Sequence, residues 1–371
     1  MLDTIKTGSK ERITSIDALR AVVLFGIILL HTSNVFGWNS LESSSWGSYA
    51  KYYIFYFLAD RCKPIFGMLF GVSFYLILRN PNYPSRRFVW RCFLLFLIGL
   101  FNKIFFTNDI LMWYGLSGMV LTCFRNLSIK KLWISFIVIY TLNLVINQFF
   151  DFKSLLFGSN FVYDRYSDGK SLTDILCYPV WLSAYYFIKR CANNPFQTLS
   201  IFLLGYCIAK SGIIDNLKKH VSFRNLIIST AIYVTLVYLE GYVHVPALEK
   251  IKNLCGAIWY ALLFLMLYYK TYPFFRFLEP YGKLGLTNYS MQGIVGIVLA
   301  GILFVPYHIS FEYYLLTMIL FYVVQVVFSI IWLRYYKYGP FEWLWRCATE
   351  KRWIKNKLWW KIWESWSILL F

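Results

Sequence analysis

Three ionisable residues, Asp17, Arg20 and His31, interrupt an apolar stretch that runs from Ile13 to Trp38. A carboxylate, a guanidinium and an imidazole can together bind a phosphate and move a proton, so they could serve a group-transfer reaction. Asp17 and Arg20 are three residues apart and share one face of a helix. His31 follows Arg20 by eleven residues, which places it within roughly 20° of Arg20 and about 16 Å further along the axis. The spacing therefore predicts a polar stripe along the first membrane span.

The same three residues also have a purely structural interpretation. Arg20 could extend to the lipid headgroups while Asp17 caps the start of the helix. His31 could lie in the outer interface of the membrane. Charged groups at membrane depth usually face a protein interior or an aqueous cavity, which favours the polar stripe.

The composition is that of a polytopic membrane protein. Of the 371 residues, 59% are hydrophobic and 15% are charged, and the mean hydropathy is +0.53. Soluble domains carry about 25% charged residues. We expect an all-α integral membrane protein with about ten transmembrane helices of ~20 residues each. The eight cysteines form no C-x-x-C pair and are expected to act as small apolar side chains.

The net charge of +19 is distributed in a way that argues against nucleic-acid binding. Basic residues gather in every second loop, as expected for loops on the cytoplasmic side of a membrane. This pattern places both termini in the cytoplasm. The basic groups are Lys6, Lys10 and Arg12; Arg79, Arg86 and Arg87; Arg125, Lys130 and Lys131; Lys210, Lys218, Lys219 and Arg224; Lys270, Arg276 and Lys283; and the C-terminal tail.

Hydropathy divides residues 1–371, a single membrane domain, into four parts. They are an N-terminal helix group (13–149), an external excursion (150–193), a C-terminal helix group (194–348) and a basic amphipathic tail (349–371). Lys, Arg and Trp alternate in the tail, which favours binding to anionic lipids. The expected spans are 14–35, 64–79, 88–105, 109–125, 131–149, 195–211, 224–243, 254–272, 284–305 and 312–335, with an interfacial helix over 51–63.

Further polar residues lie at or within the expected spans. Asp109 could orient His31 through one ring nitrogen, or it could cap the span that begins there. Asn288 and Gln292 share a helical face and could line a site or join helices by hydrogen bonds.

Two further acidic residues, Glu342 and Glu240, are expected to have structural rather than functional roles. Glu342 and Arg346 are four residues apart and are expected to form an exposed ion pair beside the membrane. Glu240 is expected at the outer interface. No cluster of His, Cys or acidic residues predicts a metal site.

Five separated blocks resemble the YeiB-like bacterial membrane protein family, whose function is unknown. They are IDALR (Ile16–Arg20), PIFGMLFGVSF (Pro64–Phe74), NDILMWYGLSG (Asn108–Gly118), GKLGLTNYSMQ (Gly282–Gln292) and IIWLRYYKYGPFEWLWR (Ile330–Arg346). They occur in family order, and only the middle of the chain, about 150–260, matches loosely.

The YeiB-like family is similar to two groups of transmembrane acyltransferases, which acetylate surface polysaccharides and heparan glucosamine. In the polysaccharide group an Arg, ten residues and a catalytic His occupy the first span, and Arg20 and His31 match this spacing. The resemblance implies that His31 is catalytic. Two positions depart from the YeiB-like pattern, which often has Asn at the position of His31 and usually Gly at that of Ala21.

We therefore expect an acyltransferase of the bacterial inner (cytoplasmic) membrane that moves an acyl group, expected to be acetyl, from cytoplasmic acetyl-CoA or another acyl-CoA to an extracytoplasmic glycan or envelope acceptor. His31 and Asp109 would be catalytic. Arg20, Asp17, Asn288 and Gln292 would bind the donor. A small-solute transporter using the same polar stripe and a non-catalytic membrane scaffold are the alternatives.

Overall fold

The computed structural model describes residues 13–36, 43–54, 58, 60–105, 109–149, 194–299, 310–357 of the chain. These residues form helices joined by short turns, with one isolated bridge between Tyr336 and Lys357 and no strand in the described ranges. The predicted all-α class is confirmed.

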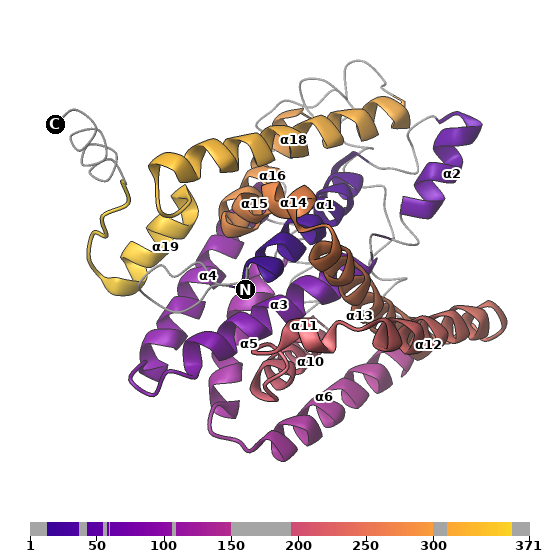
Figure 1. Ribbon diagram of the computed structural model, residues 1–371, viewed down its shortest axis with the longest axis horizontal. Helices are drawn as coiled ribbons and strands as arrows, with labels where there is room; N and C mark the ends of the chain where they lie inside the picture. Colours follow the sequence, from indigo (N-terminus) through magenta and orange to yellow (C-terminus); the bar gives the residue numbers. More distant parts are fainter. Residues whose placement is uncertain are drawn as a thin grey trace.

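Helix α1 (Thr14–Phe36) runs through the middle of the molecule and packs against α3, α13, α15 and α16 (Figure 1). Its apolar side chains are almost fully enclosed, with Ala18, Leu24 and Ile27 at 0% exposure. Among the described side chains of α1, polar groups are therefore expected to bond to neighbouring helices rather than to face lipid.

Glycines set the closest approach between α3 (Asp60–Leu78) and α10 (Asn194–Lys210). A Cβ on Gly71 would overlap the carbonyl oxygen of Phe202, and one on Gly205 would overlap that of Met68. Gly67 lies against Ile201 on the same face. The G-x-x-x-G spacing of Gly67 and Gly71 thus allows a close helix contact, because small residues let two backbones meet.

A tight hairpin joins α4 (Ser85–Phe105) to α5 (Leu111–Leu121), which continues into a 3₁₀ turn at Thr122–Phe124. Gly99 of α4 faces the backbone of Met112, and Gly115 of α5 faces the backbone of Phe96. This close crossing brings the start of α5 against the last turns of α4.

Five of the described helices are long and apolar enough to cross a membrane. Within these spans, 67% of α3 is buried but only 6% of α12. The poorly buried helices lie at the edges of the molecule in Figure 1, with α18 along the top and α6 and α12 along the lower right. Apolar surface of this kind is suited to lipid contact. The five are α3, α6 (Ile129–Phe149), α12 (Phe223–Tyr242), α13 (Pro246–Lys270) and α18 (Phe311–Tyr335).

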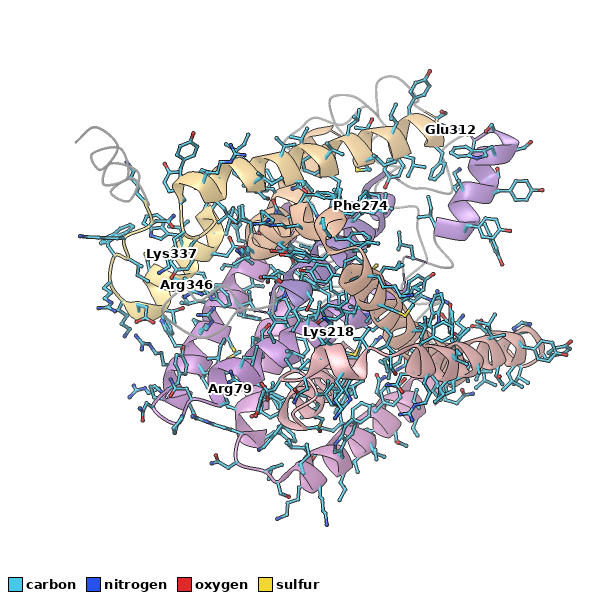
Figure 2. The ribbon with its side chains drawn as sticks, viewed as in Figure 1. Arg79, Lys218, Phe274, Glu312, Lys337 and Arg346 are labelled. Carbon is cyan, nitrogen blue, oxygen red and sulfur yellow. The ribbon has the colours of Figure 1, made fainter. Side chains whose placement is uncertain are left out.

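Short helices complete the described chain. One of them, α2, docks on the start of α18, where the backbone amide of Ser44 donates to Glu312 over 3.0 Å and Lys51 lies 5.2 Å from the centre of the Phe311 ring. Figure 2 shows Glu312 facing α2. The short helices are α2 (Ser45–Tyr53), α11 (Leu217–His220), α14 (Tyr272–Phe275), α15 (Glu279–Lys283), α16 (Gly285–Leu299) and α19 (Pro340–Glu350), with a 3₁₀ turn at Arg276–Leu278.

A helix occupies the position of each expected span, but several boundaries differ. The second begins at Asp60 rather than at Pro64, which lies inside the helix, where proline removes one amide donor from the helical hydrogen bonding. Of the helix expected over 51–63, residues 51–53 lie in α2 and 60–63 in α3, whereas 55–57 and 59 are outside the described residues. The eighth begins at Pro246, eight residues before the expected 254. Both α3 and α13 thus contain charged residues, among them Arg61 and Lys252, that precede the expected span starts.

The expected excursion (150–193) and most of the expected tail (349–371) are outside the described residues. In the predicted tail, residues 351–357 are not helical but pack on the end of α18 and on α19. The backbone amide of Lys337 donates to the carbonyl of Asn356 over 2.9 Å, and Trp343 Nε1 donates to the carbonyl of Ile354 over 2.7 Å. The remainder of the tail, 358–371, is outside the described residues.

Candidate functional site

Asp17 and Arg20 form an ion pair inside the helix bundle. Arg20 Nη1 donates to Asp17 Oδ1 over 2.7 Å, and Arg20 Nη2 donates to Ser73 Oγ of α3 over 2.6 Å. The Asp17 side chain is 2% exposed and that of Arg20 is 21% exposed. The guanidinium is therefore held between α1 and α3 and does not extend freely to the headgroups. The shared face predicted from the spacing is confirmed, and Asp17 lies within the first turn of α1.

Hydrogen bonds also fix the first turn of α1 to α13 and α15. Thr14 Oγ1 lies 3.0 Å from the Tyr268 hydroxyl, which in turn donates to Glu279 over 2.8 Å. Ser15 Oγ lies 3.1 Å from the Tyr269 hydroxyl. These contacts set the rotation of α1 about its axis, and with it the direction in which Arg20 points.

His31 belongs to the same continuous helix as Arg20. The rise of a helix therefore still separates the two residues by about 16 Å along the axis. The side chain of His31 is not among the described ones. Its predicted role as a base, and its pairing with Asp109, stay predictions.

Asp109 lies in a buried cluster formed by α4, α5 and α16. Its Oδ1 accepts from the amide of Met112 over 3.2 Å, and its Oδ2 accepts from Asn102 over 3.4 Å. The Tyr289 hydroxyl accepts from the Ile110 amide over 3.1 Å and also hydrogen-bonds the Asp109 carboxyl. Asp109 thus caps the start of α5, as one of the two interpretations of the sequence held. At 2% exposure it is enclosed by protein.

Asn288 and Gln292 join α16 to its neighbours. Asn288 Nδ2 donates to the carbonyl of Tyr281 over 3.1 Å and to Ser329 Oγ over 3.0 Å. Gln292 Nε2 donates to the Tyr281 hydroxyl over 3.1 Å and to the carbonyl of Leu24 over 3.4 Å. The hydrogen bonding between helices that the sequence allowed is therefore present. Contact of these residues with an acyl donor stays a prediction.

Helix α16 is the polar centre of the bundle. Four consecutive residues, 287–290, are each at most 2% exposed, and each contacts a different element. Thr287 meets α19, Asn288 meets α15 and α18, Tyr289 meets the start of α5, and Ser290 accepts from Asn102 of α4 over 3.2 Å. Consecutive residues of a helix point about 100° apart, so four of them reach all around it.

Glu342 does not form the ion pair with Arg346 that its spacing predicted. It accepts from the amides of Leu286 and Thr287, over 2.7 and 3.1 Å, and from the Thr287 hydroxyl. Burial raises the pKa of its carboxyl above the ordinary value. Arg346 instead stacks on the Tyr338 ring at 4.4 Å. The expectation is wrong because the amides at the start of α16 offer Glu342 better-aligned donors than a flexible guanidinium does.

The sequence-based assignment missed a second buried charged cluster, formed by α3, α12 and α13. Arg61 is 2% exposed and lies 5.9 Å from the centre of the Tyr233 ring. Lys252 is 3% exposed and is ion-paired with Glu240. Glu240 is therefore not simply interfacial. Arg61 was already within the interfacial helix expected over 51–63 and Lys252 preceded the span expected from 254, but the sequence predicted burial for neither.

Two buried amide oxygens, Asn102 Oδ1 and Gln292 Oε1, accept no hydrogen bond from the described residues. Unsatisfied buried acceptors in a native structure call for an explanation such as a bound water or ligand. Both belong to the clusters around α16. Within the described ranges, no group of three His, Cys, Asp or Glu is placed to hold a metal ion.

The chain is similar to a family of unknown function and to uncharacterized bacterial proteins. Residues 208–352 match the family described as "Protein of unknown function (DUF418)". The chain is 26% identical to YeiB of Escherichia coli over 91% of its own length and 96% of that protein's. The resemblance to the YeiB-like family is confirmed. The matched segment contains α16 and α19, which Glu342 connects.

Two Bacillus proteins are similar over nearly the whole chain. One is an uncharacterized 39.9 kDa protein of Bacillus acidopullulyticus, at 28% identity over 92% of this chain and 95% of that protein. The other is the uncharacterized protein YxaH of Bacillus subtilis, at 26% identity over 94% and 96%. No solved structure matches the chain.

Proposed function

We propose that this YeiB-like protein is an acyltransferase of the bacterial cytoplasmic membrane, with about ten spans and both termini in the cytoplasm. It moves an acyl group, acetyl in the simplest case, from a cytoplasmic acyl-CoA to an extracytoplasmic glycan or envelope acceptor. Support for the membrane setting comes from five helices long and apolar enough to span it. Support for the orientation comes from the alternation of basic loops.

The observation that carries the proposal is the held guanidinium of Arg20 on the same continuous helix as His31. Arg20 is fixed by Asp17 and Ser73 but keeps 21% of its side chain exposed. A pre-positioned guanidinium suits a phosphate of the donor, because it offers two parallel hydrogen bonds. Buried polar residues of α16, among them Asn288 and Gln292, line the same bundle and would complete the donor site.

The reaction assigns one proton transfer to His31. Its neutral imidazole takes the proton of the acceptor hydroxyl while that oxygen attacks the thioester carbonyl carbon. The tetrahedral intermediate then collapses, the C–S bond breaks, and the imidazolium returns the proton to the departing thiolate. Asp109 would hold the other ring nitrogen and fix the tautomer. No metal is needed for this balance of protons and electrons.

A transporter remains the second candidate. The observation in its favour is the chain of buried polar groups across α4, α5, α16 and α1, in which Asn102 Oδ1 and Gln292 Oε1 keep free acceptor capacity. Intramembrane polar groups of this kind also mark solute or proton paths. The two candidates differ in whether the protein binds acyl-CoA.

The deciding experiment is calorimetric binding of acetyl-CoA to the purified full chain, beside transfer of labelled acetyl to envelope glycans. We expect His31→Asn to keep donor affinity and to lower turnover by about 10²–10⁴, the usual contribution of a general base. Arg20→Ala should weaken donor binding. Arg79→Ala is the matched control, because Arg79 is an exposed arginine whose partner is Asp215.

Two results would overturn the proposal in different ways. Equal transfer by wild type and His31→Asn would remove His31 as the base. An absence of acyl-CoA binding by folded wild type would remove the acyltransferase assignment and leave the transporter.

A further inference from the structure

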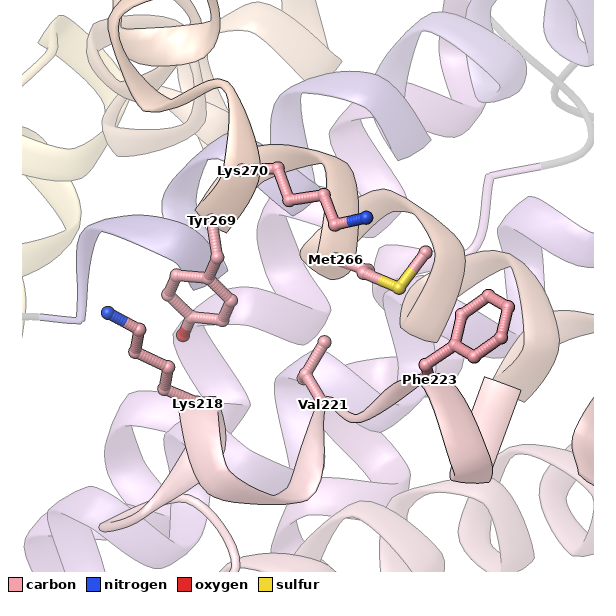
Figure 3. Close-up of a pocket in the computed structure, with 6 residues that line it drawn as sticks. All are labelled: Lys218, Val221, Phe223, Met266, Tyr269 and Lys270. Carbon is pink, nitrogen blue, oxygen red and sulfur yellow. The ribbon is translucent and has the colours of Figure 1, made fainter. Parts of the chain in front are cut away.

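A pocket of about 320 Å³ lies between α11, the first residue of α12 and the last turns of α13 (Figure 3). None of the proposed catalytic or donor-binding residues lines it, although Tyr269, whose hydroxyl meets Ser15 of α1, does. Its lining combines cations, one aromatic hydroxyl and apolar side chains. The residues are Lys218, Val221, Phe223, Met266, Tyr269 and Lys270.

The pocket has a charged part and an apolar part. Lys218 and Lys270 come from different elements, and Tyr269 lies between them in Figure 3. Both lysines are exposed. On the other side of the pocket are Met266 and Phe223, of which the latter is 67% exposed. A ligand that fits both parts carries a negative charge beside an apolar group.

The position of the pocket indicates where that ligand comes from. Helix α12 begins at Phe223 and α13 ends at Lys270, and both helices are candidate membrane spans. The pocket therefore lies at one edge of the membrane, at the level where lipid phosphates lie. Lys219 and Arg224 add exposed positive charge beside it. Cationic loops at this level attract anionic lipids.

The apolar part continues onto surface that lipid would cover. Ile227 and Ile228 of α12 are 53% and 51% exposed, and Leu267 of α13 is 41% exposed. An acyl chain that starts beside Phe223 and Met266 can thus follow these helices into the bilayer. A soluble phosphate would use only the lysines and would leave the apolar part without an occupant.

We propose that this pocket is a binding site for an anionic phospholipid, with its phosphate at Lys218 and Lys270 and the beginning of an acyl chain against Phe223 and Met266. The proposal requires that the chain span a membrane. It does not require acyl transfer, and it is distinct from the salt-sensitive lipid contact expected for the tail.

The test is native mass spectrometry of the purified full chain, titrated with phosphatidylglycerol and separately with zwitterionic phosphatidylethanolamine. Lys218→Gln/Lys270→Gln should weaken phosphatidylglycerol binding by about 25-fold, because each cation near an anionic lipid contributes about fivefold. The matched control is Lys130→Gln/Lys131→Gln, which removes the same charge from exposed lysines at the start of α6. This control should keep wild-type affinity.

A competition experiment distinguishes a lipid-binding site from a site for soluble phosphate. Inorganic phosphate and glycerol phosphate, added in millimolar excess over the lipid, should fail to displace bound phosphatidylglycerol. Met266→Trp should weaken binding of the lipid by filling the apolar part. Displacement by glycerol phosphate would show a soluble-anion site. Equal weakening by the control pair, or equal affinity for phosphatidylethanolamine, would show that no specific anionic-lipid site exists here.

Discussion

Removing the Glu342 carboxylate should destabilise the start of α16, the polar centre of the bundle, and so lower the free energy of unfolding. Glu342 stands on α19 and accepts from two backbone amides, Leu286 and Thr287, and from the Thr287 hydroxyl. Those amides have no acceptor within α16, because the first four amides of any helix lack one. Glu342→Ala leaves all three donors without this acceptor, whereas Glu342→Gln keeps a carbonyl oxygen in place.

The structure sets the size of the effect. Loss of an N-terminal cap costs about 1 kcal/mol, and a donor left without a partner in a buried site costs about 1–3 kcal/mol. Glu342 is only partly buried, so water can reach some of the freed donors. We expect Glu342→Ala to lower the free energy of unfolding by about 2–4 kcal/mol. Glu342→Gln should lower it by less than about 1 kcal/mol, because burial already disfavours the charged form of this group.

Thiol labelling during unfolding in denaturing detergent measures this difference. Cys62, Cys92 and Cys207 are buried and should react only when the bundle opens, while exposed Cys123 gives the baseline. Glu350→Ala is the matched control on the same helix, since the Glu350 pair with Arg87 is partly solvent-exposed and should contribute about 1 kcal/mol or less. If Glu342→Gln proves as damaging as Glu342→Ala, the negative charge at the helix start carries the effect and the reasoning from hydrogen bonds fails.

The remaining predictions use the same unfolding measurement. Gly205→Ala should lower the free energy of unfolding by about 1–3 kcal/mol, because the added Cβ would overlap a carbonyl oxygen of α3. Gly241→Ala is the control and should leave the free energy of unfolding unchanged, because no atom lies within 4 Å of the added Cβ. Equal effects of the two substitutions would contradict the close contact. Lys252→Met should lower the free energy of unfolding by about 1–3 kcal/mol, because the partly exposed Glu240 carboxylate loses the lysine with which it is ion-paired, and the double variant Glu240→Gln/Lys252→Met should recover much of that loss, unless the pair contributes nothing. Because burial raises the folded-state pKa of Glu342, the pH-dependent part of its contribution to stability is full below the ordinary value of 4.5 and is lost as pH rises through the raised pKa. Glu342→Gln should lack this slope, and parallel pH profiles of the two proteins would refute the prediction.

Local patterns in the sequence were enough to predict where the helices lie and which residues share a face within one helix. Apolar runs of span length predicted a helix at each expected position, because backbone groups in lipid must bond within their own segment. The three-residue spacing of Asp17 and Arg20 predicted the shared helical face on which they form their ion pair. Each of these inferences depends on geometry that a single helix fixes.

Helix starts could not be predicted as well, and the reason is physical. A lysine or arginine at membrane depth costs several kcal/mol when it faces lipid, so hydropathy ends a span before it. Arg61 and Lys252 are nevertheless inside α3 and α13, where protein groups from other helices surround them. Whether a charge faces lipid or a protein partner depends on the packing of distant segments.

The sequence by itself thus determined that this chain is helical, that it carries apolar helices of membrane length, and that Asp17 and Arg20 share a face. Only the tertiary structure decided which partner each polar group of α16 finds. Residues 287–290 are consecutive, yet they bond to elements that begin as early as residue 85 and end as late as residue 350. A helix fixes the directions in which its side chains point, but long-range packing alone fixes what lies there, which is why Glu342 was expected beside Arg346 and is found at the start of α16.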